Sequence, residues 1–189
     1  PPAVVTCATG TTGSGQCTVT FNSSTAGKVT GHASADVGVG GLSLHRETDG
    51  TGDNGSDAVK TYVDAKISIT PTETNEVGEN HTFTVNVSED AGDGSGWVPA
   101  NGETVTVSVT DSNGAISGPP SVDTCATGTT GSGQCTVTFN SSTAGKVTGH
   151  ASADVRVGGL SLHRETAGTG DNGCDSVQTY VDGQPARHP

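Results

Sequence analysis

The sequence predicts an all-β protein built from antiparallel β-sandwich repeats. Segments such as HTFTVNVS and ETVTVSVT alternate apolar and polar residues, which is the period of a strand with one buried face. Clusters of Gly, Asn, Asp and Ser separate these segments, and no stretch shows the 3.6-residue period of a helix. Roughly seven to nine short strands in one repeat unit fit a sandwich of two sheets.

The chain carries the same sequence twice. Residues 1–64 recur at 119–182, an offset of 118 residues, with seven mismatches. A near-exact repeat of this length is typical of a tandem array of domains. Because residues 1–64 match only the second half of the unit that spans 65–182, the array is cut unevenly. We expect the closing half of one immunoglobulin-sized domain at 1–64, a complete domain at 65–183, and a tail or linker at 184–189.

The opening half of the complete unit contains three expected strands. Residues 66–70 alternate and stop before Pro71, which disfavours continuation of a regular element. Strands follow at 81–88 and 103–110. Their inward faces consist of Phe83, Val85, Val87, Val105, Val107 and Val109. Turns or loops are expected at 72–80, 89–102 and 111–114, and a short strand at 115–117.

The closing half supplies the remaining strands. Residues 134–139 and 146–155 alternate, Gly158-Gly159 predicts a tight hairpin turn, and strands follow at 160–165 and 177–182. The inward residues of the longest strand are Val147, Gly149, Ala151, Ala153 and Val155.

Composition limits the classes of function. The formal net charge of −12 disfavours nucleic acid and anionic membranes as partners, and it favours divalent cations. Apolar residues make up only 30% of the chain, which with this charge would also fit disorder, but the regular alternation indicates folded strands. No run of about 18 apolar residues predicts a membrane span. No initiator Met or signal peptide is present, which we interpret as a mature or trimmed piece of a longer secreted protein.

The cysteines predict two short disulfide loops. Cys7 and Cys17 recur as Cys125 and Cys135, each pair separated by nine residues rich in Gly and Thr. A metal pair or free thiols are the alternatives, but zinc would want further Cys or His ligands close by. Disulfides indicate an oxidising, extracellular or cell-surface location. Cys174, whose counterpart is Ser56, is left over as an exposed free thiol or an intermolecular crosslink.

Three stretches carry a resemblance to a known family. VGENHTFTVNV, NGETVTVSV and GQCTVTFNSSTAGKVTGHASADV resemble the bacterial immunoglobulin-like repeat of the invasin and intimin type. The resemblance covers most of 65–156 and the matching part of 1–38, whereas 38–57 and 156–175 depart from it. It implies an immunoglobulin-like sandwich and a place in the stalk of a bacterial surface protein. The fold alone does not identify a ligand.

Several polar residues are candidate sites. Clustered oxygen ligands in two acidic loops suggest Ca²⁺, with an Asx-rich turn as the alternative: Asp49, Asp53, Asn54 and Asp57, and Asp171, Asn172 and Asp175 in the second copy. Sequons for glycosylation lie at Asn22, Asn54, Asn80, Asn86 and Asn140. Four strand histidines are expected to face solvent, with zinc as the alternative: His32, His45, His150 and His163. No nucleophile elbow, HExxH motif or phosphate-binding loop is present, so we expect no enzyme.

Two functions from different classes follow from these features. The first is a structural repeat of a bacterial extracellular fibre, filament or adhesin stalk, whose partners are copies of itself or neighbouring repeats. The second is a calcium-dependent adhesion module that binds a host or surface glycan or protein. Because residues 1–64 lack opening strands, their apolar face needs a cover. That cover is either the strands of a neighbouring subunit in a filament, or the upstream part of the same polypeptide.

Overall fold

The chain divides into two compact units. The computed structural model describes residues 4–5, 7, 14–130 and 132–183. Unit 1 is Pro1–Tyr62 and unit 2 is Val63–Pro189, so the boundary falls two residues before the expected one. The expected tail at 184–189 lies outside the described residues. No helix within the described residues is long and apolar enough to cross a membrane.

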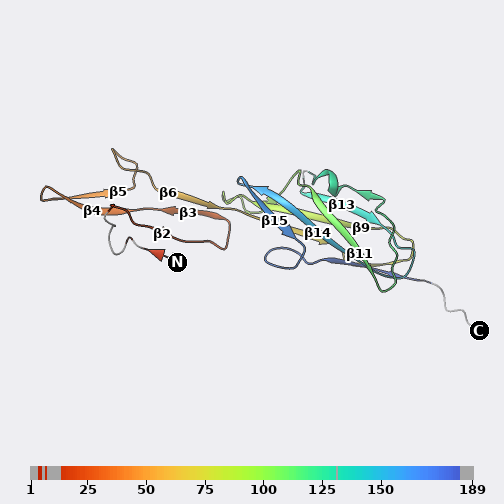
Figure 1. Cartoon of the computed structure of the whole chain (residues 1–189). Helices are drawn as coiled ribbons and strands as arrows, with labels where there is room; N and C mark the ends of the chain where they lie inside the picture. Colours follow the sequence, from red (N-terminus) through yellow and green to blue (C-terminus); the bar gives the residue numbers. More distant parts are fainter. Residues whose placement is uncertain (1–3, 6, 8–13, 131, 184–189) are drawn as a thin grey trace, which may run out of the picture. The chain divides into compact units, whose positions relative to one another are not determined.

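Unit 2 is a sandwich of two five-stranded sheets, which confirms the predicted fold class (Figure 1). The first sheet contains β7 (Asp64–Thr70), β9 (His81–Asp90), β10 (Val98–Pro99), β12 (Val122–Asp123) and β13 (Gln134–Phe139). The second contains β8 (Glu73–Glu76), β11 (Val105–Ser112), β14 (Gly145–Val157), β15 (Leu160–Glu165) and β16 (Ser176–Val181). A 3₁₀ turn, η2 (Cys125–Thr127), follows β12.

Each sheet of unit 2 combines strands from the opening half of the domain (residues 63–118) with strands from the closing half (residues 119–182). In the first sheet, β9 lies between β7 and β13, with His81–Asn86 paired to Gln134–Phe139. In the second sheet, β11 pairs with β14 over eight residues, from Val105↔Ala153 to Ser112↔Lys146. Neither sheet is complete without strands from both halves of the domain.

The core lies between the two sheets and uses the predicted inward faces. Its buried members include Ile67, Phe83, Val85, Val87, Val137, Phe139, Val147, Ala151, Val155 and Tyr180. Gly149 occupies the centre of β14, where an added Cβ would lie 2.5 Å from the Phe83 ring. Absence of a side chain there lets the aromatic ring pack directly on the strand.

Two local predictions differ from the structure. Residues 72–80 contain β8, which pairs in parallel with β16, rather than turn alone. The signal is weak because ETNE has no apolar alternation and lies at a sheet edge. The expected short strand at 115–117 is reduced to one bridge between Ser117 and Ser141.

Unit 1 forms strands equivalent to those of the closing half of unit 2, and its described residues form no second sheet that packs on them. Its elements are β1 (Val4–Val5), β2 (Val19–Thr20), β3 (Gly27–Gly31), β4 (Ser34–Val39), β5 (Leu42–Glu47) and β6 (Ala58–Tyr62). They form three two-stranded ribbons, β1–β2, β3–β6 and β4–β5. Their registers equal those of unit 2 after the 118-residue offset; for example, Gly27↔Tyr62 corresponds to Gly145↔Tyr180. None of the residues whose burial is described in unit 1 is buried.

Candidate functional site

Unit 1 has an open, largely apolar groove of about 940 Å³ on its surface. We call it the core groove. Its apolar lining comprises Cys7, Cys17, Val19, Ala33, Ala35 and Val37. The counterparts of these residues in unit 2 are Cys125, Cys135, Val137, Ala151, Ala153 and Val155, all members of the buried core. The core groove is therefore the interior of a sandwich with one half missing.

Exposed fractions measure how different the two environments are. Val37 is 45% exposed, whereas Val155 is 0% exposed. Val19 is 48% exposed, whereas Val137 is 2% exposed. Leu42 and its counterpart Leu160 are exposed in both units, which makes them ordinary surface residues of the hairpin turn. Val155 and Val137 both belong to the core of unit 2, whereas their counterparts in unit 1 are open to solvent.

An ion pair joins the two halves of unit 2. The Arg164 guanidinium on β15 lies 2.6 Å from the Asp64 carboxylate and donates to the Ala65 carbonyl at 2.5 Å. Both ionic side chains are partly buried, which strengthens the attraction between them. Arg46 is the counterpart in unit 1, is exposed, and donates to the carbonyl of its neighbour His45. Sequence reasoning missed this pair because its members lie 100 residues apart.

A histidine–aspartate–threonine cluster occurs in both units. His32 Nδ1 lies 2.8 Å from Asp57, and the Thr48 hydroxyl donates to the same carboxylate oxygen at 2.5 Å. In unit 2, His150, Asp175 and Thr166 repeat this arrangement at 2.8 and 2.6 Å. The hydrogen bond and charge of Asp57 raise the pKa of His32, and the bonds from Thr48 and His32 lower the pKa of Asp57. The cluster joins the two ends of the loop before the last strand in each copy, and in unit 2 it also joins this loop to β14 through His150.

The residues of the first predicted calcium loop bond to one another and to neighbouring strands. Asp49 accepts hydrogen bonds from the Thr51 hydroxyl, the Thr51 backbone amide and the Asn54 side-chain amide, and the bonds from Thr51 are the main cause that lowers the pKa of Asp49. Asp57 belongs to the histidine cluster, and Asp53 lines the core groove.

The second loop is similar. Asn172 accepts from the Ile67 amide at 3.2 Å and so joins this loop to β7, while Asp175 bonds to His150. Among the described residues, no group of three or more His, Cys, Asp or Glu converges in a metal-binding arrangement. Calcium binding stays a prediction, which a calcium-dependent rise in the unfolding temperature would test.

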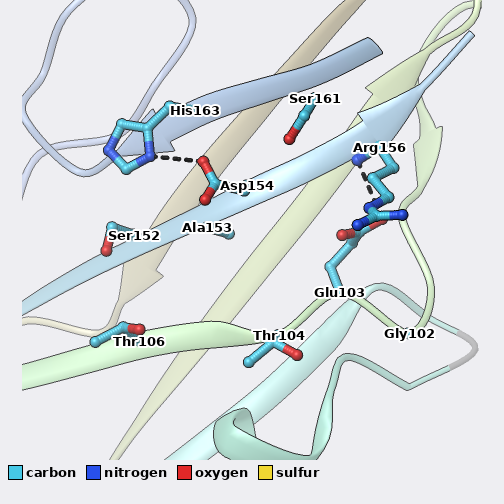
Figure 2. Close-up of a pocket in the computed structure, with 10 residues that line it drawn as sticks. All are labelled: Gly102, Glu103, Thr104, Thr106, Ser152, Ala153, Asp154, Arg156, Ser161 and His163. Carbon is cyan, nitrogen blue, oxygen red and sulfur yellow. Dashed lines mark hydrogen bonds and ion pairs between the residues drawn. The ribbon is translucent and has the colours of Figure 1, made fainter. Parts of the chain in front are cut away.

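A shallow polar groove of about 510 Å³ lies on the outer face of β11, β14 and β15 (Figure 2). His163 lies 2.9 Å from Asp154 on one side, and the Arg156 backbone amide donates to Glu103 on the other. The charges of opposite sign are spread along the groove and do not converge on one point. In unit 1 the residue corresponding to Arg156 is Gly38, so the two copies differ here.

The structure places the remaining predicted residues on the surface or in disulfides. Cys7 pairs with Cys17, and Cys125 with Cys135, in the manner the spacing predicts. Cys174 is a free, exposed thiol. Asn22, Asn80 and Asn140 are exposed, whereas Asn86 is partly covered and accepts from Gln134 at 2.7 Å. Glycosylation of these residues stays a prediction.

Comparisons with known proteins give one distant structural similarity. No family model matches the chain, and no curated protein matches it. A crystal structure of domains 4 and 5 of the S-layer protein SbsC is similar, with a TM-score of 0.38 and 16% sequence identity. The match covers 87% of this chain and 62% of the other, so the chain spans less than two thirds of that structure.

Proposed function

We propose that the chain is a structural repeat module of a bacterial extracellular fibre, filament or stalk. The observation that carries the proposal is the repeat itself. Two copies that differ at seven of 64 positions keep the same strand registers in both units. A module that only has to be repeated tolerates identical copies, whereas a specific binding module needs a distinct set of loops.

Two further features support this proposal. The disulfide in each copy fits an oxidising compartment outside the cytosol. The inward residues of unit 2 form a core and its outward residues are mainly Thr, Ser and charged, as expected for a soluble spacer. The resemblance to invasin-type repeats leads to the same class of function.

The proposal is tested by extending the array. Chains lengthened by one and two further copies of residues 65–182 are compared with the parent chain by small-angle scattering and electron microscopy. We expect the maximum dimension to grow in proportion to the number of copies. Collapse of the longer chains into compact particles would contradict a spacer. Binding of the parent chain to a glycan array, abolished by EDTA, would favour the calcium-dependent adhesion module instead.

A further inference from the structure

We propose that unit 1 is a strand acceptor whose occupant is a further opening half-domain with the strand pattern of residues 63–118. The occupant would fill the core groove, pair with the open strand edges and meet two cationic side chains of unit 1. This inference deepens the proposed structural function by naming the partner of one repeat. Its support comes from the contacts that the same residues make in unit 2.

Shape is the first argument. In unit 2, the space equivalent to the core groove is occupied by opening-half residues that include Ile67, Phe83 and Val85. Gly31 corresponds to Gly149, which has room for the Phe83 ring only because it lacks a side chain. An added Cβ at Gly31 would meet only the Ala58 carbonyl, at 3.8 Å. Glycine weakens a strand, and no contact within the described residues of unit 1 requires a glycine at position 31. A glycine at this position is instead explained if an aromatic ring of the occupant packs against it, as Phe83 packs against Gly149 in unit 2.

Backbone edges are the second argument. In unit 2, β13 pairs with β9 over residues 134–139, and β14 pairs with β11 over 146–153. The corresponding segments of unit 1 are 16–21 and 28–35. Within the described residues, neither segment has a partner strand on those edges. Two open edges of the right length match two donor strands of an opening half.

Charge is the third argument. Arg46 corresponds to Arg164, whose guanidinium pairs with Asp64 in unit 2. Lys60 replaces Gln178, which is fully buried and in register with Glu73. An opening half like 63–118 would therefore bring a carboxylate to each cation. Because burying an unpaired cation is unfavourable, these positions favour an acidic occupant over a generic apolar one.

Two aromatic residues of unit 1 already have the arrangement that their counterparts adopt in the complete sandwich of unit 2. The Phe21 and Tyr62 rings lie 6.5 Å apart, the same separation as Phe139 and Tyr180 in unit 2. The Tyr62 hydroxyl donates to the Phe21 carbonyl, as Tyr180 does to Phe139. An acceptor that already has the bound arrangement loses less conformational entropy on binding.

The occupant is a further opening half rather than a second copy of this chain. The opening half of unit 2 is already paired with its own closing half through β9–β13 and β11–β14. Releasing it would expose the unit 2 core.

The test is a fused chain in which a copy of residues 63–118 precedes residue 1. Hydrogen exchange is measured at those amides of 16–21 and 28–35 that point to the open edges and away from β1, β5 and β6, with unit 2 as the internal reference for correct folding. We expect these amides to exchange at least about a hundredfold more slowly than in the parent chain. Unchanged exchange in a fused chain whose unit 2 is folded would overturn the proposal. Aggregation of the fused chain under conditions where the parent is soluble would also overturn it.

The charge argument has its own measurement. The measurement uses the fused chain. Asp64→Asn in the added copy should speed exchange of the edge-facing amides of unit 1 about tenfold, and should have little effect once unit 1 carries Arg46→Gln. Glu79→Gln in the added copy, which removes an exposed charge, is the matched control and should leave this exchange unchanged. Equal effects of Asp64→Asn with and without Arg46→Gln would refute the predicted pairing.

A final arm separates this occupant from a second copy of the chain. Analytical ultracentrifugation and hydrogen exchange of the parent chain are compared over a range of concentrations. We expect the amides of 16–21 and 28–35 that point to the open edges to stay unprotected as concentration rises. Protection that appears with self-association would assign the surface to a second copy and overturn the proposal. These readouts do not depend on whether the assembled repeats form an extended fibre.

Discussion

At the scale of single residues, His81 is the most unusual side chain of the core. It is 3% exposed and packs edge-on against Phe83 and Phe139, with ring centroids 4.7 and 5.7 Å apart. Its Nε2 atom has no hydrogen-bond partner within the described residues. Burial lowers the pKa of His81 although the Glu73 carboxylate nearby opposes the shift, so the ring resists protonation in the folded domain.

This pKa shift predicts that unit 2 loses stability in mild acid. The unfolded histidine has a pKa of about 6.5, so below that pH the unfolded state binds a proton that folded His81 resists. Stability contributed by neutral His81 is complete above about pH 6.5 and is lost as the pH falls towards the lower folded pKa. Urea unfolding at pH 7.5 and pH 5, followed by Trp97 fluorescence, measures this loss.

His81→Phe supplies the control for that measurement, because it keeps the aromatic packing and removes the titrating group. The fall in unfolding free energy between pH 7.5 and pH 5 should be smaller in this variant than in the parent. An equal fall in both proteins would show that other groups cause the acid sensitivity.

Truncation of one valine should lower the stability of unit 2, whereas truncation of its counterpart should have little effect on unit 1. Val155→Ala removes fully buried methyl groups and should lower the free energy of unfolding of unit 2 by about 2 kcal/mol. Val37→Ala, at the corresponding position of unit 1, should change local stability by less than about 0.5 kcal/mol. Hydrogen exchange in each unit gives both numbers. A large effect of Val37→Ala would mean that Val37 is covered in solution.

At the scale of elements, strand length follows the availability of a partner. β13 runs for six residues beside β9, whereas the equivalent β2 runs for two. β14 is continuous over 13 residues beside β11, whereas unit 1 divides the same sequence into β3 and β4. Local sequence therefore sets which residues alternate, and the neighbouring strand sets how far the ladder extends.

The two disulfides should differ in their resistance to reduction. Cys125 and Cys135 are 0% and 2% exposed, whereas Cys7 and Cys17 are both exposed. A thiolate reductant must reach the sulfur atoms, so Cys7–Cys17 should be reduced at least about tenfold faster under native conditions. Timed alkylation followed by peptide mass spectrometry measures both rates. Similar rates in the native protein, or faster reduction of Cys125–Cys135, would contradict the difference in burial.

At the scale of the whole molecule, Cys174 offers a point of covalent linkage. Its thiol is exposed, and in the first copy the position is Ser56. Under oxidising conditions we expect a disulfide-linked dimer, visible on a non-reducing gel and absent on a reducing one. Cys174→Ser, which restores the residue of the first copy, should abolish the dimer and leave the fold intact. A purely monomeric parent chain after oxidation would show that the thiol does not crosslink.

Much of unit 2 was predictable from periodicity. The inward faces of residues 81–87, 105–109 and 147–155 follow from alternation because side chains of a strand point to opposite faces. β8 was not predictable, because its polar sequence forms a strand only through parallel pairing with β16. The Arg164–Asp64 ion pair was hidden for a related reason, since its members lie 100 residues apart and meet only after the sheets assemble.

The sequence by itself determined the repeat, the alternation of the strands and the match of residues 1–64 to the closing half of the repeat unit. The sequence also predicted which cysteines pair, because two cysteines ten residues apart readily close a flexible loop. Only the tertiary structure decided whether identical residues of the two copies are buried or exposed. Val155 is in a core and Val37 is at a groove because burial depends on strands that arrive from elsewhere in the chain. Local sequence determines which side chains of a strand share an apolar face, but a second sheet must pack on that face to remove it from water.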